Sequence, residues 1–332
     1  MAQIIEDVMA AAPVYRDLTP HEIADLVLGV ELRRFRSGDT MMLQGAESDG
    51  AYVITSGAVT IAERLPGGGE TVIAELGPGD LVGEMALLMR GGRRTATARA
   101  KGDVEALFID RRYFAAGLHL LRPASLKVLR RLSLTIAERL RAVRRHIRGL
   151  VDGAHVSDLF RPPPVGDEHP PSDFDVRAFM AILPSLREFD ANEIDGLFAA
   201  ARVDSVRGGS PLREQGEAAD GCRLVIRGAM LLGQRHGERL HQLDILGPGR
   251  FVGAASMLDG AQADCAVIAV EDATLLAFDA RRFIDLWNGQ DRLALRLLET
   301  ITTDLVISLD TESNHLARLA AQARMRALAG GE

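Results

Sequence analysis

Residues 83–98 read GEMALLMRGGRRTATA, and this stretch carries the most informative chemical pattern in the chain. Gly83 and Glu84 open a short apolar turn, and Arg94 follows ten residues after the carboxylate. Backbone N–H groups at the start of a short helix, such as that of Ala86, have no partner within the helix and can bind an anion. Arg94 can add a planar, permanently charged guanidinium to the same oxygens. The stretch therefore predicts an anion clamp beside a carboxylate that can accept a hydrogen bond from a hydroxyl.

Short alternating segments separated by glycine turns surround this stretch. The turns before it are Ser37-Gly38-Asp39, Gln44-Gly45, Ser56-Gly57 and Gly77-Pro78-Gly79-Asp80. Glycine at such turns permits backbone conformations that other residues resist, and many short strands with such turns favour a closed or double-sheet β architecture. We therefore expect an α+β fold, mainly β, in which a jelly-roll-like β-roll is flanked by helices at Pro20–Val30 and at about 122–150.

A long internal repeat indicates that this roll occurs twice. The segment AYVITSGAV at 51–59 returns as CRLVIRGAM at 222–230, and LGPGD at 76–80 returns as LGPGR at 246–250. The offset is 171 before the central loop and 170 after it, so the second copy lacks one residue there. Similarity that keeps register over such lengths predicts two tandem rolls.

The boundaries between the copies follow from composition. Residues 1–150 form the first predicted domain with its long C-terminal helix, and 176–332 form the second with C-terminal helices. The segment 151–175 between them is rich in proline, which is typical of an extended, semi-rigid linker.

The stretch and its surroundings resemble the cyclic nucleotide-binding domain family, over roughly residues 13–148. This family includes bacterial catabolite activators, kinase regulatory subunits and cyclic nucleotide-gated channels. The resemblance implies a sensor whose first domain binds cAMP or cGMP and then repositions the helix at 122–150 and the second domain, so regulating a partner protein. One alternative is a structural or interaction scaffold with vestigial nucleotide sites. A DNA-binding regulator is less expected, since no helix-turn-helix follows the rolls.

The resemblance also implies roles for individual residues. The cyclic phosphate would be held by Arg94 and the backbone of Ala86, and the ribose by Glu84 and the backbone of Gly83. The full set of expected ligand-binding residues is Ile73, Gly83, Glu84, Met85, Ala86, Arg94, Thr95 and Arg144. Thr95 can contact both phosphate and a guanine, and Arg144 can pair with a guanine edge or serve as an ordinary solvated charge. The choice between cAMP and cGMP stays open.

The second copy of the stretch lacks the groups that the first would use. Ala254 stands in the place of Glu84, and Asp264 and Cys265 stand in the places of Arg94 and Thr95. A charge-assisted hydrogen bond contributes about 1.5–3 kcal/mol, and its replacement by a like charge adds repulsion. We therefore expect the second domain to bind no cyclic nucleotide in the manner of the family.

The helix after the first roll carries one apolar stripe with spacings of three and four residues. Its members are Leu129, Leu132, Ile136, Leu140, Val143, Ile147 and Leu150. Such a stripe either packs on its own chain or joins two copies, so a homodimer through residues 122–150 is one expectation.

Composition narrows the class of protein. The chain has 332 residues, a net charge of −7 and a pI near 5.7, which argues against a broad nucleic-acid footprint. Its two cysteines form no disulfide framework or metal-ligand cluster, and no apolar run has the length of a membrane span. The N-terminus carries acids where a secretory signal carries bases. We expect a soluble cytoplasmic protein with no catalytic residues, no metal and no cofactor other than its ligand.

Overall fold

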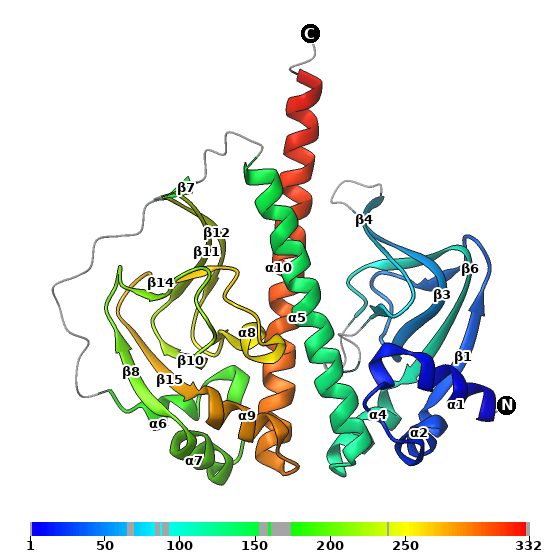
Figure 1. Ribbon diagram of the computed structural model, residues 1–332, viewed down its shortest axis with the longest axis horizontal. Coiled ribbons are helices and arrows are strands. Elements are labelled where there is room, and N and C mark those ends of the chain that lie inside the picture. The colour runs from blue at the N-terminus through cyan, green and yellow to red at the C-terminus, as the bar shows by residue number, and fades with distance from the viewer. Residues whose placement is uncertain are drawn as a thin grey trace. The chain divides into compact units, whose positions relative to one another are not determined.

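The computed structural model describes residues 2–64, 70–83, 87, 93–152, 159–160, 174–237 and 239–329. The chain divides into two compact units, Met1–Leu132 and Ser133–Glu332, and each contains antiparallel strands flanked by helices (Figure 1). The division falls inside helix α5 (Pro123–Asp152), not after it at residue 150 as the sequence predicts. The helix itself has almost the predicted length.

The first unit contains one antiparallel sheet with the order β1-β6-β3-β4, in which β2 also pairs with β6 and β5 with β3. Its strands are β1 (Val30–Phe35), β2 (Thr40–Met42), β3 (Gly50–Arg64), β4 (Glu70–Leu76), β5 (Leu81–Val82) and β6 (Thr97–Asp110). The long β3–β6 pairing shifts register on both sides of Ser56, and the second shift spans Gly57. Gly57 has a φ of +84°, and a Cβ there would collide with the carbonyl oxygen of Asp103, so only glycine fits this bend.

The core of the first roll consists of alternating positions on these strands. Small residues of β6, including Ala98, Ala100 and Ala106, lie beside the larger Tyr52 and Phe108 in one buried cluster. This alternation is the period-two pattern of a strand with one buried face.

Short helices flank the first roll. They are α1 (Ala2–Ala11), η1 (Pro13–Tyr15), α2 (Pro20–Leu26), η2 (Val27–Gly29) and α4 (Arg111–His119), followed by the start of α5. Helix α2 begins with a capping box in which Thr19 and Glu22 each accept a backbone N–H of the other. The helix predicted at Pro20–Val30 therefore starts as expected but ends in a 3₁₀ turn. It stops there because Val30 belongs to β1 and pairs with Ile109 of β6.

The second unit repeats the roll with its long strands divided. Its two antiparallel sheets have the orders β13-β10-β15-β8 and β7-β12-β11-β14-β9. The strands are β7 (Leu159–Phe160), β8 (Arg202–Val206), β9 (Pro211–Arg213), β10 (Gly221–Arg227), β11 (Met230–His236), β12 (Arg239–Leu246), β13 (Phe251–Val252), β14 (Ala266–Ala269) and β15 (Ala273–Asp279). Gly228, with a φ of +83°, separates β10 from β11 where Gly57 bends β3. The predicted fold class of two tandem β-rolls flanked by helices is confirmed.

The helices of the second unit are α6 (Val176–Met180), η3 (Pro184–Leu186), α7 (Ala191–Ala200), α8 (Ala254–Asp259), α9 (Ala280–Asn288) and α10 (Arg292–Ala329). The residues of the predicted linker at 153–158 and 161–173 lie outside the described residues. Between them β7 pairs with Leu240 and His241 of β12, so this part of the linker adds a strand to the roll.

The second half of α5 belongs to the core of the second unit. Ile147 and Val151 are buried in one cluster with strand residues such as Val225, Met230 and Val267. Ile147 of the predicted stripe is therefore covered within the chain, which argues against the homodimer expected through residues 122–150.

Candidate functional site

The turn at Gly83 and the side chain of Arg94 meet in the first unit. Gly83 has a φ of +80°, and a Cβ at this residue would collide with Nη1 of Arg94. Nη1 lies 3.5 Å from the carbonyl oxygen of Gly83, and Nη2 donates to Oδ1 of Asp49 at 2.9 Å. Arg94 is 8% exposed, so its charge lies under the turn at which the predicted anion clamp begins.

The backbone of Arg94 is fixed by the loop between β2 and β3. The carbonyl oxygen of Arg94 accepts from the N–H of Gly45 at 2.8 Å, and its N–H donates to Ala46 at 2.9 Å. The side chain of Asp49 is 67% exposed, so its ion pair with Arg94 is accessible to solvent. This arrangement holds a guanidinium against a glycine turn and pairs it with a solvent-exposed carboxylate.

The other predicted residues of the first site divide into two groups. Thr95 is exposed and Ile73 is 39% exposed on β4. Glu84, Met85 and Ala86 lie outside the described residues.

Arg144 does not join this set, because all of its described hydrogen bonds are made within the second unit. Nε and Nη2 donate to the two carboxylate oxygens of Glu312 at 2.8 and 2.7 Å, and Nη1 donates to Oδ1 of Asp264 at 3.0 Å. Neither a guanine contact nor a solvated charge, the two interpretations that the sequence left open, describes this buried side chain. The reason is that its two carboxylate partners lie 168 and 120 residues away in sequence.

The second unit retains the turn but supplies its arginine from strand β9, whereas Arg94 precedes β6. Gly253, with a φ of +85°, begins α8, and Arg213 of β9 lies against it as Arg94 lies against Gly83. Arg213 donates to Asp220 and to the carbonyl oxygen of Gly221. The repeat offset places Arg213 at the position of Met42 and Asp220 at that of Asp49.

A comparison of residues 83–98 with their counterparts in the second copy does not find Arg213, because this arginine lies outside the compared stretch. The signal that could have found it is the retained aspartate, Asp49 and Asp220, combined with the exchange of Met42 for Arg213. The charge beside the second turn is therefore not simply reversed by Asp264.

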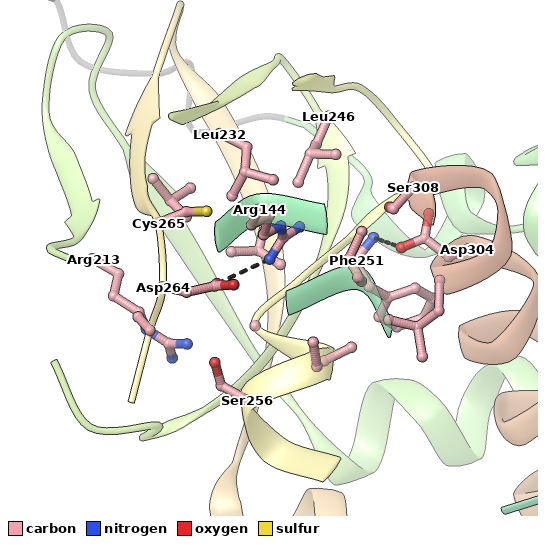
Figure 2. A pocket seen from close by; sticks show the side chains of 18 residues that line it. Arg144, Arg213, Leu232, Leu246, Phe251, Ser256, Asp264, Cys265, Asp304 and Ser308 are labelled. Carbon is pink, nitrogen blue, oxygen red and sulfur yellow. Dashed lines mark hydrogen bonds and ion pairs between the residues drawn. The ribbon is translucent and has the colours of Figure 1, made fainter. Parts of the chain in front are cut away.

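A pocket of about 50 Å³ remains beside the Gly253 turn. Leu140 and Arg144 of α5, Ser256 of α8 and Asp264 line it, and Figure 2 shows Arg144 and Asp264 pointing toward one another. Ligand pockets commonly enclose roughly 300–1,000 Å³. The space beside the second turn is thus largely filled by the chain's own helix.

The electrostatics of this pocket agree with the ion pair between Arg144 and Asp264. Burial opposes the charge of Arg144, but Glu312 and Asp264 outweigh it and raise the Arg144 pKa well above its ordinary value. Burial also raises the pKa of Asp264, but Arg144 and Arg141 more than offset that effect and lower it. Both partners are therefore charged at neutral pH.

The chain matches the cyclic nucleotide-binding domain family twice, at residues 32–119 and 203–290, which together are more than half of its length. It is 37% identical over 134 residues to the cyclic AMP receptor protein of Thermus thermophilus, covering 40% of this chain and 59% of that protein. It is 32% identical over 107 residues to a CRP-like cAMP-activated global transcriptional regulator of Mycobacterium tuberculosis, covering 32% and 47%. The chain thus spans about half the length of these curated relatives.

Among solved structures, the regulatory domain of Toxoplasma gondii PKA with cAMP is similar, with 17% identity and a TM-score of 0.32. The similarity covers 87% of this chain and 93% of that one. No helix in the described part of the chain combines the length and the apolarity needed to cross a bilayer.

Proposed function

Because the chain belongs to the cyclic nucleotide-binding domain family, we propose that its first unit binds a cyclic nucleotide and that the protein signals this binding to a partner protein. The observation that carries the proposal is the guanidinium of Arg94, buried against the Gly83 turn and paired with an exposed carboxylate. A cyclic phosphate can replace the Asp49 carboxylate and gain charge-assisted hydrogen bonds from the same guanidinium.

The names of the curated relatives support cAMP as the first ligand to test. The exposed hydroxyl of Thr95 is compatible with either a phosphate or a guanine contact, so cGMP is the matched second ligand. The second unit offers a poorer site, because residues of α5 occupy the space beside its turn.

Helix α5 is the proposed route for the signal. It is one continuous helix that begins in the first unit and ends in the second. A ligand can shift the equilibrium between two positions of the helix only by the difference between its affinities for them. The proposal therefore requires the nucleotide to favour one position of α5 over the other.

Titration calorimetry with cAMP, cGMP and a cyclic dinucleotide tests the proposal. We expect one site per chain, and Arg94→Gln should weaken binding by about ten- to a hundredfold, since it removes a charge-assisted bond of about 1.5–3 kcal/mol. The matched control is Arg93→Gln. The Arg93 side chain is exposed and donates to the carbonyl of Gly45, so its loss should leave affinity within about twofold.

Absence of binding by the wild-type chain contradicts the proposal and favours the scaffold with vestigial sites. Equal binding by wild type and Arg94→Gln would place the ligand away from the Gly83 turn. Two sites per chain would show that the second unit also binds nucleotide.

A further inference from the structure

We propose that the second unit is a binding site for an arginine-bearing amphipathic helix, and that residues 133–152 of α5 are its resident ligand. The site lies where the second copy of the roll carries its altered turn, between α8, α10 and the strands. The inference concerns the second unit alone and does not require nucleotide binding by the first.

Arg144 is the centre of the contact. Its bidentate pair with Glu312, which is fully buried, and its bond to Asp264 give three charge-assisted hydrogen bonds to two carboxylates. Gln234 of β11 also donates to the backbone carbonyl of Arg144 at 2.9 Å. Two carboxylates around one point in a pocket select a cation and repel a phosphate.

Arg141, one turn earlier, binds the end of α8. It forms an ion pair with Asp259 and donates to Ser256 Oγ at 3.0 Å and to the carbonyl oxygen of Gln262 at 2.9 Å. Arg141 thereby fixes the short helix that in the first copy would start the anion clamp.

Apolar residues on the same face of α5 complete the contact. Leu140 lines the pocket, and Ile147 and Val151 are buried among the strands of the roll. Leu140 and Ile147 lie four and three residues from Arg144, and Val151 lies four residues after Ile147, so one helix face presents both the charge and the apolar surface.

The differences between the two copies of the repeat agree with this function. Asp264 replaces Arg94 and pairs with Arg144 of α5, and Arg250 replaces Asp80 and pairs with Asp304 of α10. The first exchange puts a carboxylate partner for α5 in the place of the predicted phosphate-binding arginine, and the second adds an arginine partner for α10. The second roll thus contains the chemistry of a helix receptor in the place of a nucleotide site.

Hydrogen exchange of the full chain tests whether the helix behaves as a ligand. We expect the amides of residues 140–151 and of α8 to exchange through a local opening, at least about tenfold faster than those of β10 and β15. In Arg144→Gln this opening should become about 30-fold or more easier, because one partner of a buried ion pair is lost. The control Arg145→Gln alters the exposed neighbour on the same helix and should leave exchange unchanged.

Exchange of residues 140–151 only together with β10 and β15 overturns the proposal, since the helix would then be an inseparable part of the core. The milder variant Asp264→Asn keeps Glu312 and provides the test if Arg144→Gln does not fold. Both variants remove the hydrogen bond between Arg144 and Asp264. The free-energy changes that they cause in the opening of the helix should therefore be non-additive in the double variant. Additive accelerations overturn the assignment of Arg144 as the group that the site recognises. No nucleotide is used, so these outcomes are independent of the proposed function.

Discussion

Arginine–carboxylate pairs decide the chemistry of both glycine turns at the level of single residues. In the first unit Arg94 pairs with an exposed carboxylate, Asp49, which the proposed cyclic phosphate would displace. In the second unit Arg213 is 4% exposed, and Asp220 binds both Arg213 and Arg223. Hydrogen bonds from Arg223 and Arg213 hold the pKa of Asp220 below its usual range. Both turns thus have a buried arginine paired with an exposed aspartate, and the second aspartate binds an additional arginine.

Asp264 makes the stability of the second unit depend on pH. Its pKa in the folded chain lies below the value of about 3.9 expected when unfolded. Its contribution is therefore complete above about pH 4 and decreases as the pH falls through the lowered folded pKa. Urea midpoints of wild type and Asp264→Asn should differ at pH 6 and converge below about pH 4. A difference that stays constant down to pH 3 would contradict the ion pair with Arg144.

At the level of elements, local sequence predicts the helix α5, but tertiary contacts decide how it packs. Its apolar spacing is local and predicts a helix at 122–150, close to the observed Pro123–Asp152. Which neighbour covers each part of the stripe is not local, and the division between the units falls within the helix.

Gly149 is a weak point of α5 that a single substitution can correct. A Cβ at this exposed residue would meet no atom within 4 Å. Gly149→Ala should therefore raise the free energy of unfolding by about 0.5–1 kcal/mol, as expected for a glycine inside a helix. Urea unfolding followed by circular dichroism measures this gain.

The matched control is Gly117→Ala in α4, where a Cβ would collide with Oγ of Ser125, and this variant should lose stability. A loss of stability in Gly149→Ala would indicate that this face of α5 is covered.

At the level of the whole molecule, burial of the α5 stripe bears on association. Ile136, Leu140 and Ile147 are each at most 1% exposed in the folded chain. They offer no seam to another copy, so light scattering should give a mass near the 35.8 kDa of one chain. The mass should be the same with and without cAMP. Twice this mass would show that another surface joins two copies.

The sequence by itself determined the family, the two rolls, their glycine bends and the extent of the long helix. These properties depend on short-range patterns: turns at Gly57 and Gly228, strand alternation, and apolar spacing along one helix face. The alignment of the two copies of the repeat also predicted that the second turn differs chemically from the first.

Only the tertiary structure decided what occupies the second turn. Arg144 meets Glu312 and Asp264 across 168 and 120 residues, and Arg213 of β9 lies against the second turn as Arg94 lies against the first. Ion pairs between distant residues leave no periodic signal, because their energy depends on distance and burial in the folded chain. For the same reason the sequence predicted that the second domain binds no cyclic nucleotide in the manner of the family, but not that residues of α5 line the space beside its turn.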